Sequence, residues 1–156
     1  MTSVVVDIDD TLINTDRRMQ AIWSLVLSCS VPLEAIETLS LERIFMEFSS
    51  SKQKQRANEF QRRFWDLVLC LDNAGTESLH LHEPFSFAAE VLQLWSRHST
   101  LVYLTGRTEN MREITLNELR KFSFPTENTD LVMFNLADFS RIRGVESSGP
   151  KLVDVK

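Results

Sequence analysis

The first apolar segment of this chain ends abruptly in acidic side chains. Residues 4–12 read Val-Val-Val-Asp-Ile-Asp-Asp-Thr-Leu. Because polar and apolar residues do not alternate ahead of the acidic cluster, the segment predicts a parallel strand that is buried on both faces. Open α/β sheets bind ligands at the carboxyl ends of their strands, which is where Asp7, Asp9 and Asp10 fall. Three neighbouring carboxylates repel one another, and a divalent cation is the expected compensation.

The length and charge of the chain limit the classes of protein to which it can belong. Its 156 residues suit one domain with a modest insertion. The formal net charge of −5 argues against a nucleic-acid-binding surface. No charged-then-apolar leader opens the sequence, and no apolar run approaches the roughly 20 residues that span a bilayer. We therefore expect a cytoplasmic protein that has no membrane partner.

A long stretch after the acidic cluster shows helical periodicity. Met19, Ile22, Trp23 and Val26 follow the spacing of one face of an amphipathic helix. Further helices are predicted around Ile36, around Ile44 and from Phe60 to Leu71, with Ser40 as the cap of the second of these. Residues 73–76, Asn-Ala-Gly-Thr, then predict a turn.

The rest of the sequence alternates between helical and strand patterns. Pro84 is predicted to open a helix, and buried strands are predicted at residues 101–104 and 131–134. Strands that are separated by helices imply parallel pairing with right-handed crossovers. After the third strand the sequence reads as a loop, and Leu152 begins a last helix.

Together these segments predict an α/β fold in two parts. A doubly wound, Rossmann-like parallel sheet forms the core, from residues 1–16 and 82–156. An all-helical cap, residues 17–81, is inserted into this core. Since no fourth strand follows, the C-terminal part of the core is missing.

Two motifs at strand ends resemble those of a known enzyme family. Asp7-x-Asp9-x-Thr11 follows the first strand, and Thr105-Gly106-Arg107 follows a later one. In this order, they resemble the first two motifs of the haloacid dehalogenase-like (HAD) hydrolase superfamily. The resemblance covers residues 3–15 and about 84–134, and the helical insertion is similar to the family's cap of the first type. It implies a phosphatase that uses Mg²⁺ and forms an aspartyl-phosphate intermediate.

The chemistry of phosphate-ester hydrolysis agrees with this resemblance. The reaction needs a nucleophile, a proton donor for the leaving oxygen and positive charge near the phosphoryl oxygens. Asp7 suits the nucleophile, because its carboxylate can form an aspartyl-phosphate that water hydrolyses. Asp9 points the same way as Asp7 if strand geometry continues, and it is the expected acid and base. The resemblance implies that Asp7 and the backbone carbonyl of Asp9 ligate Mg²⁺, while Thr11 orients Asp9 or braces the turn.

The residues after the second strand are candidate phosphate contacts. Thr105 is expected to donate its hydroxyl group to a phosphoryl oxygen, beside Gly106. Two alternatives stay open for Arg107, which approaches the phosphate or pairs with Glu109 or Asp10. Asp10 is assigned no chemistry of its own.

The two remaining motifs of the family are not both present. The first is a lysine that neutralises the phosphoryl site; Lys151 and Lys156 are candidates, and the resemblance favours Lys156. The second is an acidic pair that ends a fourth strand and holds Mg²⁺. This pair is missing, since neither Asp138 nor Asp154 follows a suitable strand. We therefore expect the 156 residues alone to bind Mg²⁺ weakly.

The missing fourth strand also leaves Val4-Val5-Val6 on an exposed sheet edge, which is an aggregation hazard. Three explanations stay open. The chain is a fragment of a longer protein, a partner subunit in a homo-oligomer completes the sheet and the metal site, or the chain is a shortened relative with little activity.

The leading hypothesis is hydrolysis of a phosphomonoester. Dehalogenases of the superfamily lack the second aspartate, so Asp9 favours a phosphatase. A helical cap implies a substrate that is small enough to be enclosed, which indicates a small phosphorylated metabolite. A phosphatase for polynucleotide ends is one alternative, which the negative charge and the cap disfavour. A non-catalytic interaction module that kept the fold is another, which the retention of Asp7 and Asp9 disfavours.

Overall fold

The computed structural model describes residues 2–135 of the chain. These residues fall into two compact units, of which the first holds residues 2–15 and 83–135 and the second holds residues 16–82. The helix predicted at Leu152 lies outside the described range. Within that range, no helix has the length and apolar character that a membrane crossing requires.

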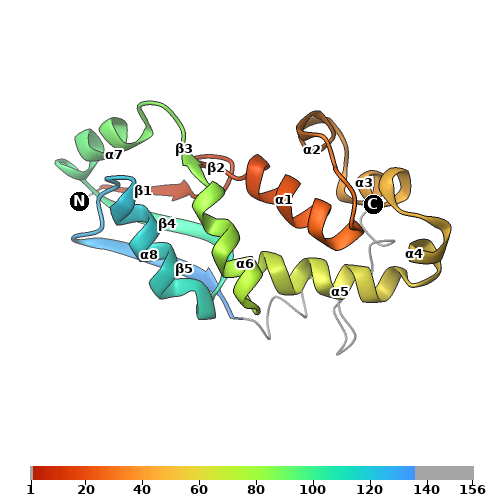
Figure 1. The fold of residues 1–156 in the computed structure, drawn as a ribbon. Coiled ribbons are helices and arrows are strands. Elements are labelled where there is room, and N and C mark those ends of the chain that lie inside the picture. The colour runs from red at the N-terminus through yellow and green to blue at the C-terminus, as the bar shows by residue number, and fades with distance from the viewer. Residues whose placement is uncertain (1, 136–156) are drawn as a thin grey trace. The chain divides into compact units, whose positions relative to one another are not determined.

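The first unit is built on a three-stranded parallel sheet (Figure 1). Its strands are β1 (Thr2–Asp7), β4 (Ser99–Thr108) and β5 (Thr129–Phe134), in the spatial order β1-β4-β5. In the β1–β4 pair, Val4 lies opposite Leu101. The β-branched residues of β1 favour such an extended backbone. The predicted fold class, a Rossmann-like α/β core with parallel strands, is confirmed.

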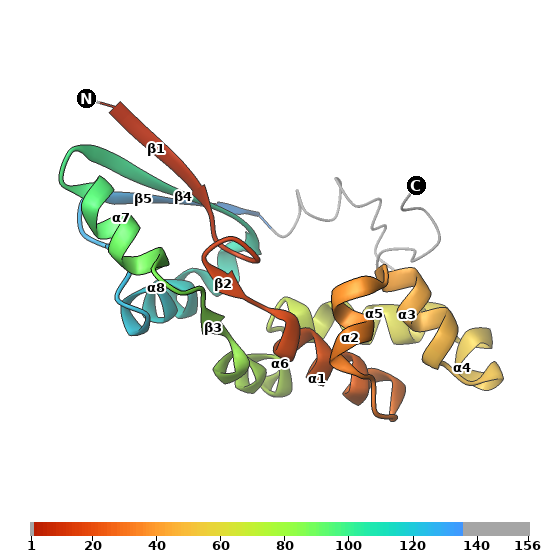
Figure 2. The same cartoon turned by 90° about the horizontal axis from the view of Figure 1, so that it is seen from above.

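Helices α7 (Ala88–Ser96) and α8 (Arg112–Lys121) lie on the same face of this sheet (Figure 2). Because the chain passes from β1 to β4 to β5 in one direction, right-handed crossovers place both helices on that face. A short 3₁₀ helix, η2 (Glu109–Met111), precedes α8. The core of the first unit lies between the helices and the sheet and is formed by Ile8, Leu92, Leu101, Tyr103, Leu119 and Phe124.

The opposite face of the sheet is not covered by these two helices. Val5, in the middle of β1, is 63% exposed, and Leu104 and Val132 on the neighbouring strands are exposed as well. The prediction that the first strand is buried on both faces is therefore wrong. Within residues 2–135, β1 is an edge strand that pairs with β4 alone, and its outer face meets solvent.

A two-stranded antiparallel sheet marks where the chain leaves the first unit and returns to it. In this sheet, β2 (Ile13–Asn14) pairs with β3 (Glu83–Pro84). The helix start predicted at Pro84 is wrong, because Pro84 belongs to β3 and α7 begins four residues later. The backbone N–H of Phe85 donates to the carbonyl oxygen of Leu12 (2.9 Å), and Phe87 adopts a φ of 65°, which lies outside the helical region.

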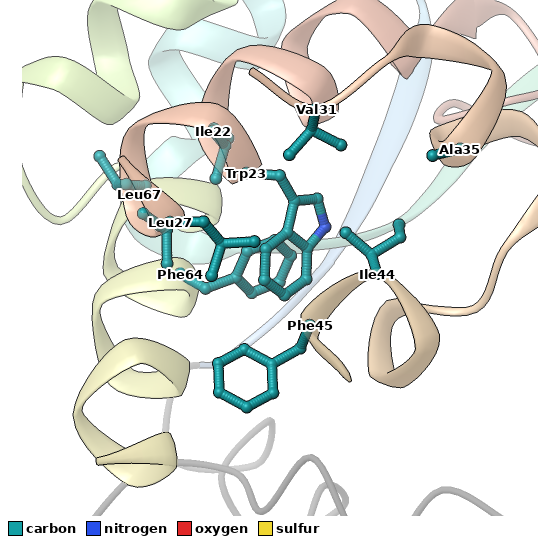
Figure 3. Packing of buried hydrophobic residues seen from close by; sticks show 10 residues of the cluster. Ile22, Trp23, Leu27, Val31, Ala35, Ile44, Phe45, Phe64 and Leu67 are labelled. Carbon is teal, nitrogen blue, oxygen red and sulfur yellow. The ribbon is translucent and has the colours of Figure 1, made fainter. Parts of the chain in front are cut away.

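The second unit consists of helices throughout residues 16–82. They are α1 (Asp16–Leu27), α2 (Leu33–Thr38), α3 (Leu41–Phe48), α4 (Ser51–Gln55), α5 (Ala57–Val68), α6 (Asn73–Glu77) and the 3₁₀ helix η1 (Ser78–Leu81). Ser40 caps α3, as predicted, by accepting a hydrogen bond from the backbone N–H of Arg43. Trp23 of α1 stacks on Phe64 of α5 with ring centroids 4.4 Å apart (Figure 3). This pair lies in a hydrophobic core that the second unit forms by itself.

Contacts of Arg18 and Gly75 connect α1, α5 and α6. Arg18 of α1 is buried, and its Nη2 donates to the carbonyl oxygens of Leu67 (3.1 Å) and Gly75 (3.4 Å). Residues 73–76, predicted as a turn, instead begin α6, because Asp72 Oδ1 accepts from the backbone N–H of Gly75 (2.8 Å) and caps the helix. Gly75 packs so closely on α5 that a Cβ there would overlap the carbonyl group of Leu67.

We predict that Gly75→Ala destabilises the second unit, whereas Gly106→Ala leaves stability unchanged. The added methyl group at Gly75 forces α6 away from α5, and overpacking of this kind lowers the free energy of unfolding by about 1–3 kcal/mol. At Gly106, an added Cβ meets no atom within 4 Å, which makes this variant the matched control. Urea denaturation measures both. A Gly75→Ala midpoint equal to that of the wild type would contradict the packing described here.

Candidate active site

Polar side chains gather at the carboxyl ends of β1 and β4. β1 ends at Asp7, whose register partner is Leu104, and β4 continues through Thr105 and Arg107. The pairing of β4 with β5 is irregular beyond Leu104, and such irregularities are common beside active sites. Because side chains alternate along a strand, Thr105 and Arg107 lie on the buried face of β4.

The carboxylate of Asp9 is held by these two residues of β4. Asp9 follows β1, and its Oδ2 accepts a hydrogen bond from Thr105 Oγ1 (3.0 Å). Arg107 donates from Nη2 to Oδ1 (2.7 Å) and from Nε to both carboxylate oxygens (3.1 Å each). Bidentate, charge-assisted contacts of this kind are among the strong hydrogen bonds of proteins. The Asp9 side chain, 32% exposed, is therefore oriented by its partners at the border of the buried region.

Arg107 is shared between two carboxylates. Its side chain is 5% exposed, and Nη1 donates to Glu118 Oε2 (2.6 Å) and to Thr115 Oγ1 (3.2 Å), both on α8. Burial alone lowers the pKa of a guanidinium, but the attraction of Asp9 and Glu118 outweighs burial and raises the pKa of Arg107 above its ordinary value. Arg107 therefore stays charged and pairs with both carboxylates.

One of the two alternatives for Arg107, pairing with Glu109 or Asp10, is wrong, because its carboxylate partners are Asp9 and Glu118. Glu109 instead accepts two hydrogen bonds from Arg112 (2.7 Å each) at the surface. Asp10 Oδ1 accepts from the backbone N–H (3.2 Å) and from the hydroxyl group (2.6 Å) of Thr15. The alternation along β4 explains the difference, because it turns Arg107 toward the buried face, while Glu109 in η2 and Asp10 in a turn are exposed.

Asp7 has surroundings that differ from those of Asp9. Its carboxylate is exposed, and Oδ2 accepts a hydrogen bond from Thr11 Oγ1 (3.3 Å). Thr11 thus contacts Asp7 rather than Asp9, in a turn that is closed by a hydrogen bond from the backbone N–H of Leu12 to the carbonyl oxygen of Ile8 (2.9 Å). The expectation that Asp9 points the same way as Asp7 requires the strand to continue. β1 ends at Asp7, so strand alternation does not set the direction of Asp9.

Thr105 and Gly106 are the described candidates for phosphate contacts. The Thr105 hydroxyl group is buried, donates to Asp9 and accepts from the backbone N–H of Arg107 (3.1 Å). In this structure the hydroxyl proton of Thr105 is therefore engaged in a hydrogen bond within the protein. Gly106 lies two residues beyond the register partner of Asp7, and a Cβ built there meets no atom within 4 Å. A ligand can therefore approach the backbone at Gly106.

The described residues do not form a complete magnesium site. Residues 2–135 contain no group of three or more histidine, cysteine, aspartate or glutamate residues placed to hold a metal ion. Asp7 offers one exposed carboxylate, but both oxygens of Asp9 accept hydrogen bonds from Arg107. The candidate lysines Lys151 and Lys156 lie outside the described residues.

Glu118 and Thr115 belong to this cluster although no sequence motif marks them. Both lie on the buried face of α8, beside the fully buried Leu119. The sequence does hold a signal, since Glu118 is a charged residue on a helix face that is otherwise buried. A buried charge requires a partner of opposite sign, and Arg107 at the end of a buried strand meets that requirement.

Comparisons with known proteins bear on the fold. No protein-family model and no curated protein matches this chain. Among solved structures, the chain is similar to a haloacid dehalogenase-like hydrolase from Streptococcus pneumoniae, with a TM-score of 0.55 and 15% sequence identity. The match covers 91% of this chain and 68% of that chain. The chain therefore has the α/β fold of a haloacid dehalogenase-like hydrolase.

We predict that Arg107→Met strongly destabilises the first unit. The substitution leaves the buried carboxylate of Glu118 without this partner, and breaking a buried ion pair in this way costs about 3–5 kcal/mol. The control is Arg56→Met, which removes an ion pair with Glu59 that is exposed to solvent, where such pairs contribute little to stability. Chemical denaturation compares the two variants. Similar losses of stability would argue against a special role for the buried pair.

We also predict that the 156-residue chain binds Mg²⁺ weakly, in the millimolar range. The reason is that the described residues supply one exposed carboxylate and a second that is engaged by a guanidinium, whereas tight sites use more oxygen ligands. Isothermal titration calorimetry of the wild type and of Asp7→Asn measures the affinity and the contribution of Asp7. Micromolar binding by the wild type would overturn this prediction.

Proposed function

We propose that this chain is a hydrolase of the haloacid dehalogenase-like superfamily that cleaves phosphate monoesters. Asp7 is the nucleophile, and Asp9 is the acid and base. The observation that carries the proposal is the contrast between two carboxylates only two residues apart. Asp7 is exposed, whereas Asp9 is oriented by Thr105 and Arg107. The similarity in fold to a haloacid dehalogenase-like hydrolase supports the same class of reaction.

The proposed reaction has two steps that restore the protein after each turnover. In the first, a carboxylate oxygen of Asp7 attacks phosphorus, the bond between phosphorus and the leaving oxygen breaks, and Asp9, which enters the step in its protonated form, gives that oxygen its proton. In the second, water attacks the phosphorus of the aspartyl-phosphate while Asp9 takes a proton from the water. Inorganic phosphate leaves, and Asp7 regains its carboxylate.

A phosphate group that approaches Asp7 needs compensating positive charge. Arg107 is already engaged by two carboxylates, so we propose Mg²⁺ as the cofactor and Lys156, with Lys151 as the alternative, as the phosphate-binding cation. Within the described residues, the Asp7 carboxylate and the Asp9 backbone carbonyl are the proposed ligands of Mg²⁺. Bound Mg²⁺ would supply charge that offsets repulsion between the carboxylate and the phosphate.

The proposed substrate class is a small phosphorylated metabolite. The helical unit, residues 16–82, is an insertion between β2 and β3, and we propose that it acts as a cap that limits substrate size. Nucleic-acid-binding surfaces attract phosphates with an excess of basic residues, and the net charge of −5 disfavours such a substrate. A metabolite phosphatase is therefore favoured over a polynucleotide end phosphatase.

We predict that the chain releases inorganic phosphate from 4-nitrophenyl phosphate at millimolar Mg²⁺ and that Asp7→Asn lowers kcat/KM by at least about 10³-fold, as loss of a nucleophile does. Asp10→Asn is the matched control. It removes a neighbouring charge, keeps an oxygen that can accept from Thr15, and retains most of the activity. Colorimetric phosphate release measures all three proteins. Full activity in Asp7→Asn, or equal losses in both variants, would exclude Asp7 as the nucleophile.

A further inference from the structure

We propose that Glu118 is a positioning residue of this site, which fixes Arg107 from the buried side so that Arg107 orients the carboxylate of Asp9. The proposal rests on the function proposed above, because it assigns Asp9 the transfer of a proton. Glu118 itself does not touch the reacting atoms. It lies on α8, and its influence reaches Asp9 through a guanidinium.

Asp9 requires external support because of its place in the chain. It lies two residues beyond the end of β1, where the backbone has an isolated β-bridge to Ile13 instead of a continuous ladder of hydrogen bonds. Its side chain is partly exposed, and exposed carboxylates exchange between rotamers readily. A group that gives a proton to a leaving oxygen must lie within hydrogen-bond reach of it. Thr105 and Arg107 supply the needed restraint through four hydrogen bonds.

Arg107 in turn requires support, because its long side chain has about 2 kcal/mol of rotamer entropy to lose. The guanidinium uses two different edges. Nε and Nη2 face Asp9, while Nη1 donates to Glu118 (2.6 Å) and Thr115 (3.2 Å). Since the guanidinium is planar and rigid, fixing Nη1 fixes the edge that faces Asp9.

Glu118 is itself firmly placed. It is 7% exposed and belongs to α8, which is anchored in the core by its neighbour Leu119. Burying a carboxylate is costly, and a buried ion pair as a whole can often be replaced by apolar residues of similar volume without loss of stability. A role in stability alone therefore does not account for Glu118, whereas a role in orienting Arg107 does.

The test compares Glu118→Gln and Glu118→Ala with the wild type in the full-length chain. Glu113→Gln, on the exposed side of the same helix, is the matched control. The substrates are phenyl phosphate and 4-nitrophenyl phosphate, which are similar in shape. Phenolate is the poorer leaving group and depends on a proton from Asp9, whereas 4-nitrophenolate leaves with little assistance. The ratio of their kcat/KM values therefore reports the position of the general acid.

We expect Glu118→Ala to lower kcat/KM for phenyl phosphate about tenfold more than for 4-nitrophenyl phosphate, which is a part of the roughly 10²–10⁴-fold that a positioned general acid contributes. Glu118→Gln keeps an acceptor for Nη1 and should show a smaller change in the same direction. Glu113→Gln should leave the ratio unchanged. Equal losses on both substrates, or no loss on either, in variants that stay folded would overturn the proposal.

A second measurement does not depend on turnover. In ¹⁵N-correlated NMR spectra, the Nε–H group of a guanidinium held in buried hydrogen bonds exchanges slowly with water. We expect the Arg107 Nε–H signal to be sharp in the wild type and in Glu113→Gln, and to broaden or exchange at least about tenfold faster in Glu118→Ala. An unchanged signal would show that Glu118 does not hold Arg107. If the wild type hydrolysed neither substrate, the proposed function would be wrong. The NMR comparison would then still test whether Glu118 holds Arg107.

Discussion

The contact between Asp9 and Arg107 is the interaction on which the arrangement of this site depends. It joins residues that are 98 positions apart in the sequence, and it forms because β1 and β4 are parallel neighbours with their carboxyl ends side by side. The guanidinium is buried and is also bound by Glu118 on α8. The turn after β1, the end of β4 and the helix that follows are thereby linked through one side chain. Loss of that side chain would leave buried negative charge behind, which is why the three groups depend on one another.

This linkage gives two aspartates of one turn different chemical properties. Asp9 is oriented by donors of two residues of β4, while Asp7 keeps an exposed carboxylate that accepts a hydrogen bond from Thr11 (3.3 Å). A nucleophile must be accessible to the phosphorus atom, and a group that transfers protons must be held at a defined place. The two proposed roles therefore fall in different surroundings, because β1 ends at Asp7 and Asp9 lies beyond the strand, where it contacts Thr105 and Arg107 of β4.

The sequence predicts those parts of the fold that depend on local patterns. The end of β1 at Asp7 follows from an apolar run that stops at a polar residue, and the cap of α3 follows from Ser40. The second strand, by contrast, continues past its predicted end at Thr105 to Thr108. What the sequence does not predict depends on neighbours far along the chain. Pro84 belongs to a strand because β2 lies beside it, and the partner of Arg107 is set by which face of β4 it occupies. Spacing in the sequence leaves both a phosphate and the nearby acidic residues open as partners of Arg107, whereas the structure pairs Arg107 with Asp9 and with Glu118 on the buried face of α8.

We propose that Asp7 is phosphorylated while Asp9 serves the proton transfers. The most direct test is mass spectrometry of an Asp9→Asn variant that is acid-quenched during reaction with 4-nitrophenyl phosphate. This ester needs little help from an acid to phosphorylate Asp7, but water attack on the phosphorylated protein lacks its base, so the intermediate should accumulate. We expect one phosphoryl group on the peptide that contains Asp7. A phosphoryl group on another residue, or none while 4-nitrophenol is released, would contradict it.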